Sequence, residues 1–135
     1  MYRIAIPSFQ RPIIFRKRSL NCIQKFNIPL STIDLFLENE EQYDLYQKEL
    51  GSLMTEFGNV ILTKTVGVGA KRNAIRKYYH DKEKIINVVQ MDDDVESFWD
   101  MQGKLLDLNQ FIVDAFVYTG EQNLNCWGII SHDNN

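Results

Sequence analysis

The chain has 135 residues with 44% hydrophobic and 24% charged side chains, which suits one soluble domain with a core of its own. A net charge of -3 argues against a protein that coats nucleic acid, because such proteins carry a basic face. No stretch is long and apolar enough for a signal peptide or a membrane span, and the distant Cys22 and Cys126 form no metal-ligand pair, so a reduced cytoplasmic protein is expected.

Strand and helix patterns alternate along the sequence. Short apolar, β-branched runs are typical of strands, and apolar residues three and four apart are typical of helices. These patterns predict strands over 3–6, 31–37, 60–63, 85–89 and 124–130, and helices over 12–26, 38–53 and 108–118. Within 67–79 they predict a glycine-containing loop that leads into a basic helix. The alternation predicts a single α/β domain over 1–135 with a mainly parallel sheet and helices on both faces.

Right-handed crossovers bring the C-terminal ends of parallel strands to one edge of the sheet. That edge is expected to collect the segments that follow the predicted strands. They are residues 7–11, Glu38, residues 65–73 and residues 92–94. Their clustering is the main structural expectation from the sequence.

Three consecutive carboxylates, Asp92, Asp93 and Asp94, follow the apolar run at 85–89. Adjacent acids repel one another unless a positive group lies among them, and ligands of open α/β sheets bind at this end of the strands. A hard divalent cation held by one or two carboxylates and by substrate phosphates would satisfy both conditions. A solvated acidic turn is the simpler alternative.

The segment 67–73, GVGAKRN, is neither a P-loop nor a complete dinucleotide fingerprint. Its glycines let the backbone approach a ligand, and the start of the following helix offers free N–H groups to anions. Lys71 and Arg72 add positive charge suited to phosphate, although a flexible turn before a surface helix is the alternative. Together the two loops predict a site for a diphosphate bridged by a divalent cation, which would act as a Lewis acid on the leaving phosphate.

The order of these features resembles the nucleotide-sugar-binding half of a GT-A type glycosyltransferase. A strand ends in Pro-Ser, a strand precedes an acid, Gly-x-Gly-Ala-Lys-Arg-Asn opens a helix, an apolar strand precedes Asp-x-Asp, and Cys-Trp-Gly follows. The sequence is most similar to small viral and phage-type transferases with a DDD version of Asp-x-Asp, over residues 4–133. The resemblance implies a Rossmann-like GT-A fold, an Mn²⁺ or Mg²⁺ cofactor, a UDP- or GDP-sugar donor and, for a viral protein, the host cytoplasm.

The resemblance also implies roles for individual residues. The family pattern implies nucleotide contacts from Pro7, Ser8, Arg11, Glu38, Gly67, Lys71, Arg72, Asn73, Asp92 and Asp93. It implies metal ligands in Asp94, Asp92 and His132. It also implies a floor beneath the transferred sugar at Trp127 and Gly128, and a catalytic base in Asp133. The middle carboxylate, Asp93, is expected near the ribose. A polar tail is the alternative for His132 and Asp133.

Enzymes of this kind usually run well beyond this length, with the acceptor pocket in the later part. The resemblance therefore implies a fragment, or a donor-binding domain whose acceptor part lies elsewhere. Two other functions stay open: a Toprim-type nuclease or phosphotransfer domain, which would use Glu38 as an additional acid, and a non-catalytic nucleotide-binding module. Nucleic acid is expected only as a modified acceptor, and the base, sugar, acceptor, stereochemical outcome and oligomeric state stay open.

Overall fold

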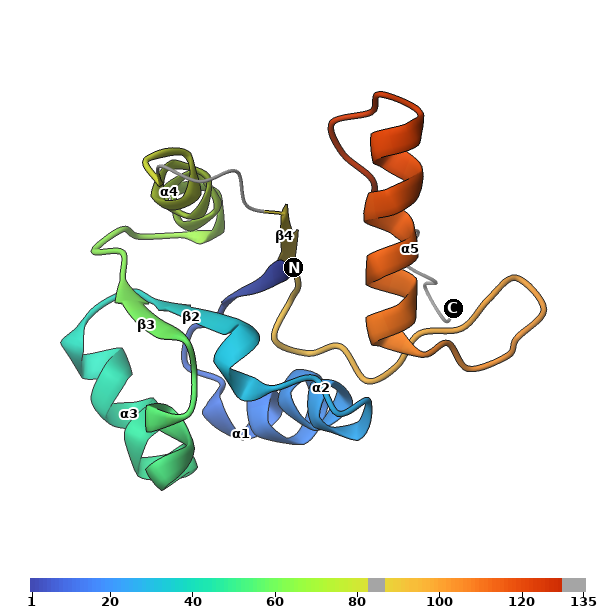
Figure 1. Cartoon of the computed structure of the whole chain (residues 1–135). Helices are drawn as coiled ribbons and strands as arrows, with labels where there is room; N and C mark the ends of the chain where they lie inside the picture. Colours follow the sequence, from blue (N-terminus) through green and yellow to red (C-terminus); the bar gives the residue numbers. More distant parts are fainter. Residues whose placement is uncertain (83–86, 130–135) are drawn as a thin grey trace.

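A computed structural model describes residues 1–82 and 87–129 (Figure 1). Its centre is a four-stranded sheet in the order β3-β2-β1-β4, and every pair of neighbouring strands is parallel. The strands are β1 (Tyr2–Pro7), β2 (Ile33–Leu37), β3 (Asn59–Leu62) and β4 (Asn87–Gln90). The longer helices are α3 (Glu40–Leu50), α4 (Val68–His80) and α5 (Leu108–Glu121), and a continuous helical segment joins α1 (Pro12–Phe15), the π-helical turn η1 (Arg16–Leu20) and α2 (Asn21–Lys25). The predicted α/β class with a parallel sheet is confirmed.

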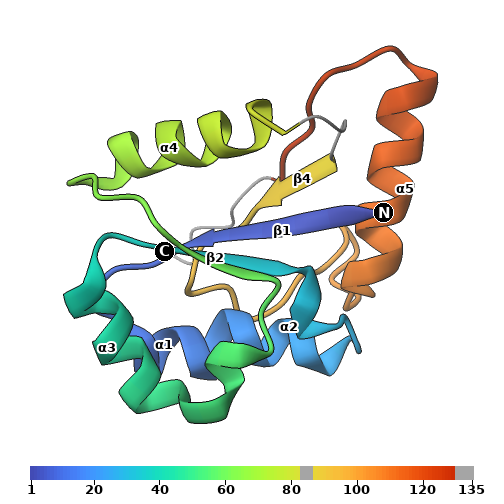
Figure 2. The same ribbon diagram turned by 60° about the vertical axis from the view of Figure 1, so that its left-hand side comes forward.

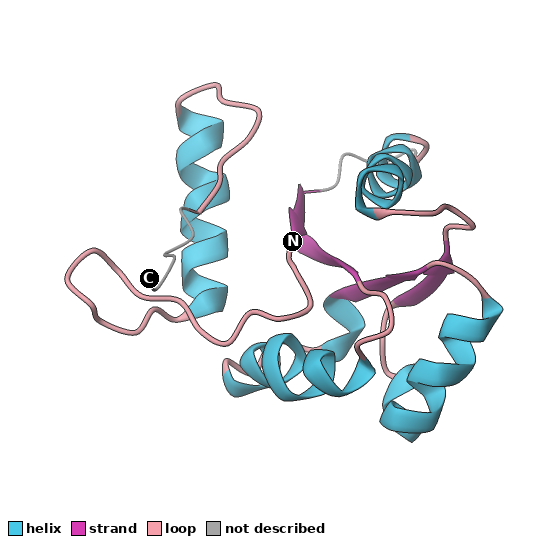
Figure 3. Cartoon of the chain, turned by 180° about the vertical axis from the view of Figure 1, so that it is seen from behind, coloured by secondary structure: helices cyan, strands magenta, loops and turns pink. Residues whose placement is uncertain are grey.

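Helices cover both faces of the sheet (Figures 2 and 3). Successive strand residues point to opposite faces, so each central strand serves two cores. On one face, Ala5 and Phe36 pack with Ile75 of α4. On the other face, which α1, α2 and α3 cover, lies a larger core built mainly on β1 and β2. It buries Ile4, Ile6, Phe15, Leu20, Ile23, Leu35, Leu37, Tyr46, Leu108 and Ile112, among others.

The sheet has a topological switch point between β1 and β4. From β1 the chain builds β2 and then β3 towards one side, with α1, α2 and α3 on one face. Helix α4 then crosses the other face, and the chain returns to place β4 on the far side of β1. Ligands of open α/β sheets bind outside the carboxyl ends of the strands at such a point. The segments 8–11 and 91–94 therefore flank the position that the topology favours for a ligand.

Several predicted boundaries differ from the structure. Helix 12–26 contains a π-helical turn, and α3 ends at Leu50, where a 3-10 helix (Gly51–Thr55) takes over. Strand β4 begins at Asn87, and positions 85 and 86 of the predicted strand lie outside the described residues. No helix among the residues that the structure describes is long and apolar enough to cross a membrane.

The predicted strand at 124–130 is wrong over its described part, because residues 124–129 have no regular structure. Asn123 has a positive φ of 54°, which turns the chain back after α5. The ring of Trp127 then packs edge-on against Phe111 and Phe116, with centroids 5.7 and 5.4 Å away. The apolar side chains of this segment thus pack on a helix. A short apolar run in the sequence does not show whether it will pack in this way or form a strand.

Candidate functional site

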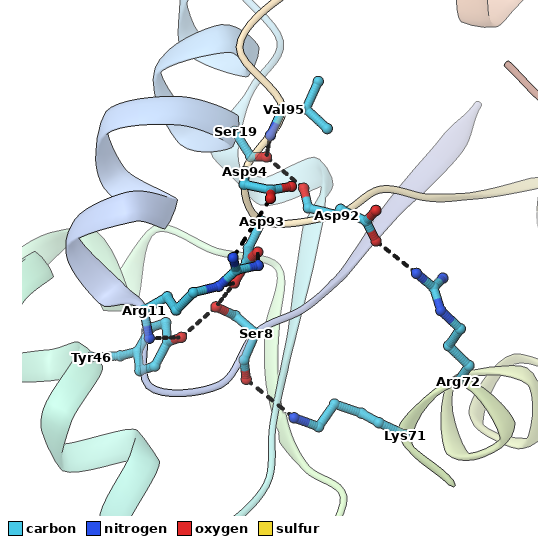
Figure 4. A network of polar contacts seen from close by, with 10 residues as sticks. All are labelled: Ser8, Arg11, Ser19, Tyr46, Lys71, Arg72, Asp92, Asp93, Asp94 and Val95. Carbon is cyan, nitrogen blue, oxygen red and sulfur yellow. Dashed lines mark hydrogen bonds and ion pairs between the residues drawn. The ribbon is translucent and has the colours of Figure 1, made fainter. Parts of the chain in front are cut away.

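Charged side chains gather at the C-terminal edge of the sheet, on the segments that follow β1 and β4 and on the first turns of α4 (Figure 4). We call this cluster the rim and define it as Ser8, Arg11, Lys71, Arg72, Asp92, Asp93 and Asp94. The pairing of Ala5 with Gln90 brings the two strand ends level, so Ser8 and Asp93 meet three residues further on. The predicted clustering of the basic and the acidic segment at one edge is confirmed, since Arg72 Nη2 lies 2.6 Å from Asp92 Oδ1. The basic segment is not a loop, because α4 already begins at Val68 and contains Lys71 and Arg72.

The middle carboxylate, Asp93, points inward and holds the rim together. Its side chain is only 3% exposed. One oxygen accepts from Ser8 Oγ at 2.6 Å, and the guanidinium of Arg11 donates to both oxygens. Because the single hydroxyl proton of Ser8 goes to Asp93, the Tyr46 hydroxyl donates to Ser8 Oγ, and it accepts from the backbone N–H of Arg11 at 3.2 Å. Asp93 is therefore an anchor of the rim, whereas the family resemblance implied that it contacts the ribose.

The two outer carboxylates face solvent. The Asp92 side chain is 59% exposed and pairs with Arg72, which also donates to Gln90 Oε1 at 3.3 Å. The Asp94 side chain is 40% exposed, and its Oδ2 lies 3.6 Å from Nη1 of Arg11. Both carboxylates can therefore reach a ligand at the rim. To do so they give up only their contacts with the two arginines, which are exposed and individually weak.

Lys71 is the buried cation of the rim. The residue is 5% exposed, and its ammonium donates to the backbone oxygen of Ser8 at 3.2 Å and lies 5.3 Å from the ring centroid of Phe9. Within the described part of the chain, no carboxylate lies within ion-pair distance of this ammonium. Burial lowers the pKa of Lys71, and the charges of Glu38 and Asp93 oppose that shift without reversing it. A buried charge is costly unless it is paired, so Lys71 is ready to accept an anionic partner.

Ser19 fixes the acidic loop from the opposite side. It lies in the π-helical turn and is fully buried. Its hydroxyl donates to the backbone oxygen of Asp92 and accepts from the backbone N–H of Val95 at 2.9 Å, so it spans the loop that carries all three carboxylates (Figure 4). The insertion of one residue into a helix re-aims its side chains, and such turns are frequent at functional sites.

Replacing Ser19 with alanine is expected to lower the free energy of unfolding by about 1–2 kcal/mol, because it leaves the part-buried backbone N–H of Val95 and the backbone carbonyl of Asp92 without the hydroxyl as their partner. Urea denaturation measures the loss. Ser52→Ala, at an exposed position of the 3-10 helix, is the matched control and is expected to change stability by less than about 0.5 kcal/mol. Equal losses in the two variants would show that Ser19 does not hold the loop.

The other predicted site residues lie at different distances from the rim. Pro7 ends β1, and Glu38 follows β2 half-buried, close enough to influence the pKa of Lys71. Gly67 is the N-cap of α4 with a φ of 90°, and Asn73 is exposed on that helix. Trp127 and Gly128 are not brought into the rim's polar network, and Trp127 packs instead on Phe111 and Phe116 of α5. His132 and Asp133 lie outside the described residues.

The outer carboxylates suit a hard divalent cation without forming a complete site for one. Over the described ranges, no three His, Cys, Asp or Glu side chains converge on one point. Mg²⁺ and similar ions, however, are commonly held by one or two carboxylates while substrate phosphates and water complete the shell. Exposed Asp92 and Asp94 on one short loop fit that mode.

Comparisons with known proteins identify no relative: no protein-family model, no curated protein and no solved structure matches the chain. The chemistry of the rim is therefore the basis for a functional proposal.

Proposed function

We propose that the chain is the donor-binding domain of a metal-dependent glycosyltransferase, which binds a nucleoside-diphosphate sugar at the rim. The observation that carries the proposal is the buried ammonium of Lys71, which lacks a carboxylate partner among the described residues and belongs to the same rim as the exposed side chains of Arg72, Asp92 and Asp94. The rim thus offers cationic groups for phosphates and carboxylates for a cation at one edge of the sheet. That edge includes the switch of strand order, where nucleotide ligands bind in doubly wound sheets.

The residues of the chain have separable tasks under this proposal. Lys71 and Arg72 bind the diphosphate, and Arg72 can do so with two parallel hydrogen bonds. Asp92 and Asp94 would hold Mn²⁺ or Mg²⁺, which when bound supplies Lewis-acid stabilisation of the leaving diphosphate. Ser8, Arg11 and Tyr46 fix the loop through Asp93 and keep the outer carboxylates in place.

In the transfer step, the bond between the anomeric carbon of the sugar and the β-phosphate oxygen breaks. The same carbon forms a bond to an acceptor oxygen, the acceptor proton leaves to a base, and the nucleoside diphosphate departs with the electron pair. The positive groups of the rim stabilise the charge that develops on the departing phosphate.

Thermal unfolding with UDP, GDP and their sugars, with and without Mn²⁺, tests donor binding. A ligand that binds only the folded state raises the melting temperature, by an amount set by its concentration relative to its dissociation constant. We expect stabilisation by a nucleoside diphosphate in the presence of Mn²⁺ and its loss in Asp94→Ala. Asp81→Ala, beyond the far end of α4, is the control and is expected to respond as the wild type does.

Failure of every nucleotide to stabilise the protein would contradict donor binding. Hydrolysis of a UDP- or GDP-sugar by the wild type and not by Asp94→Ala would support transfer chemistry. Stabilisation without hydrolysis would support a non-catalytic nucleotide-binding module instead, and cleavage of plasmid DNA would support the nuclease alternative.

A further inference from the structure

We infer that the rim binds a divalent cation and a diphosphate more tightly together than either one alone. The reason is that Asp92, which would bind the cation, and Arg72, which would bind the diphosphate, are paired with each other when no ligand is present. This inference rests on the proposed function and concerns how the two ligands depend on each other. The contact is direct, with Nη2 of Arg72 2.6 Å from Oδ1 of Asp92. Both side chains are substantially exposed, at 42% and 59%, so both can turn towards a ligand.

The rim has three carboxylates and three cationic side chains, but in the described residues only the two arginines lie within ion-pair distance of the carboxylates. Arg11 neutralises Asp93 and lies near Asp94, and Arg72 neutralises Asp92. Lys71 is the exception, with an ammonium that has no carboxylate partner in the described residues. The carboxylates are therefore already committed to arginines, while one buried positive charge still lacks an anion.

A ligand that binds alone and uses its member of the Arg72–Asp92 pair breaks the contact and leaves the other member without a partner. A cation that binds Asp92 leaves Arg72 unpaired and next to an added positive charge. A diphosphate that binds Arg72 leaves Asp92 unpaired and next to added negative charge. When both bind, Asp92 contacts the cation and Arg72 contacts the phosphate, so each regains an opposite charge. Coupling between two ligands is reciprocal, so each raises the affinity for the other by the same factor.

Replacing one residue of the Arg72–Asp92 pair should then raise the affinity for the ligand that binds the other residue. Arg72→Gln frees Asp92 and is expected to bind Mn²⁺ alone roughly twofold to fivefold more tightly than the wild type, the range set by an exposed ion pair. Asp92→Asn frees Arg72 and is expected to bind UDP or GDP more tightly by a similar factor in buffer with EDTA. A role of Arg72 in folding alone would not raise affinity for a cation.

Free Mn²⁺ measured by electron paramagnetic resonance gives the cation affinity, and calorimetry in EDTA gives the nucleotide affinity. Arg76→Gln, one turn further along α4 and exposed, is the matched control and is expected to equal the wild type in both. Because a nucleoside diphosphate chelates Mn²⁺ in solution, each ligand is titrated without the other.

A gain in Mn²⁺ affinity in Arg72→Gln and in nucleotide affinity in Asp92→Asn supports the inference. Unchanged or lower Mn²⁺ affinity in Arg72→Gln, in a protein whose wild type binds Mn²⁺ with UDP or GDP, overturns the inference and leaves the proposed function standing. Absence of nucleotide binding in the wild type with Mn²⁺ present overturns the proposed function itself, and with it the inference.

Discussion

Replacing Lys71 with methionine is expected to stabilise the ligand-free protein and to weaken binding of a nucleoside diphosphate about tenfold to hundredfold. The affinity loss follows from removing a charge-assisted hydrogen bond to phosphate, worth about 1.5–3 kcal/mol. The stability gain follows because Lys71 is a 5% exposed residue whose ammonium has no carboxylate partner among the described residues, and methionine removes that buried charge at similar volume. We expect a gain of about 1 kcal/mol in urea denaturation.

The pH dependence of this gain has a defined sign. Burial lowers the pKa of Lys71 in the folded state. Between the lowered pKa and the ordinary value of about 10.4, the unfolded chain therefore binds more protons than the folded protein, and stability rises with pH. The stability advantage of Lys71→Met over the wild type should be full below the folded-state pKa and should shrink as the pH rises towards the ordinary value.

Lys77→Met is the matched control, because Lys77 is an exposed lysine on the same helix. It is expected to leave nucleotide affinity unchanged and to alter stability by less than about 0.5 kcal/mol. If Lys71→Met destabilised the protein and bound nucleotide as the wild type does, Lys71 would be a structural residue and the main support for the proposed site would be lost.

Asp34→Ala is expected to cause the largest loss of stability, about 3 kcal/mol in urea denaturation. Asp34 is 1% exposed and accepts hydrogen bonds from Arg3 Nε at 3.1 Å, Asn59 Nδ2 at 2.9 Å and the Tyr79 hydroxyl at 2.6 Å. These contacts tie β1, β2, β3 and α4 together beneath one face of the sheet. Because the Arg3 side chain is 25% exposed, the cost of leaving it unpaired belongs at the lower end of the range for buried pairs.

This loss should also depend on pH. Burial alone would raise the pKa of Asp34, but the hydrogen bonds from Arg3, Tyr79 and Asn59 outweigh burial and lower it. The stabilisation is therefore full above the ordinary value of about 3.9 and disappears as the pH falls through the lower folded-state pKa. The gap between wild type and Asp34→Ala should narrow in acid, whereas exposed Asp44→Ala should stay within about 0.5 kcal/mol of the wild type throughout. A gap at neutral pH no larger than that of Asp44→Ala would refute the anchoring role.

The existence of the rim could be predicted from the sequence, because it depends on connectivity. Apolar runs that alternate with helical patterns specify parallel strands, and right-handed crossovers place all their C-terminal ends together. From this connectivity alone, Arg72 and Asp92 could be predicted to lie at the same edge, where they form an ion pair. This prediction did not require knowledge of strand order or of any side-chain conformation.

The inward orientation of Asp93 could not be predicted in the same way. It depends on the register in which β4 pairs with β1, since a shift of one residue would turn a neighbouring carboxylate inward. The role of Ser19 depends on a π-helical turn that no residue pattern in 12–26 signals, and Tyr46 reaches Ser8 from a helix on the opposite side of the core. These contacts join residues that are far apart in the sequence, so the residue pattern within one helix or strand does not predict them.

Nuclear magnetic resonance with paramagnetic Mn²⁺ tests the location of the site most directly. Added with UDP or GDP, Mn²⁺ broadens the signals of backbone amides near it. We expect broadening of residues 91–95, 8–11 and 67–72, with α5 unaffected, and loss of this pattern in Asp94→Ala. Broadening centred on other acidic segments, such as the start of α3 at Glu40 and Glu41, would contradict a cation-bound diphosphate at the rim.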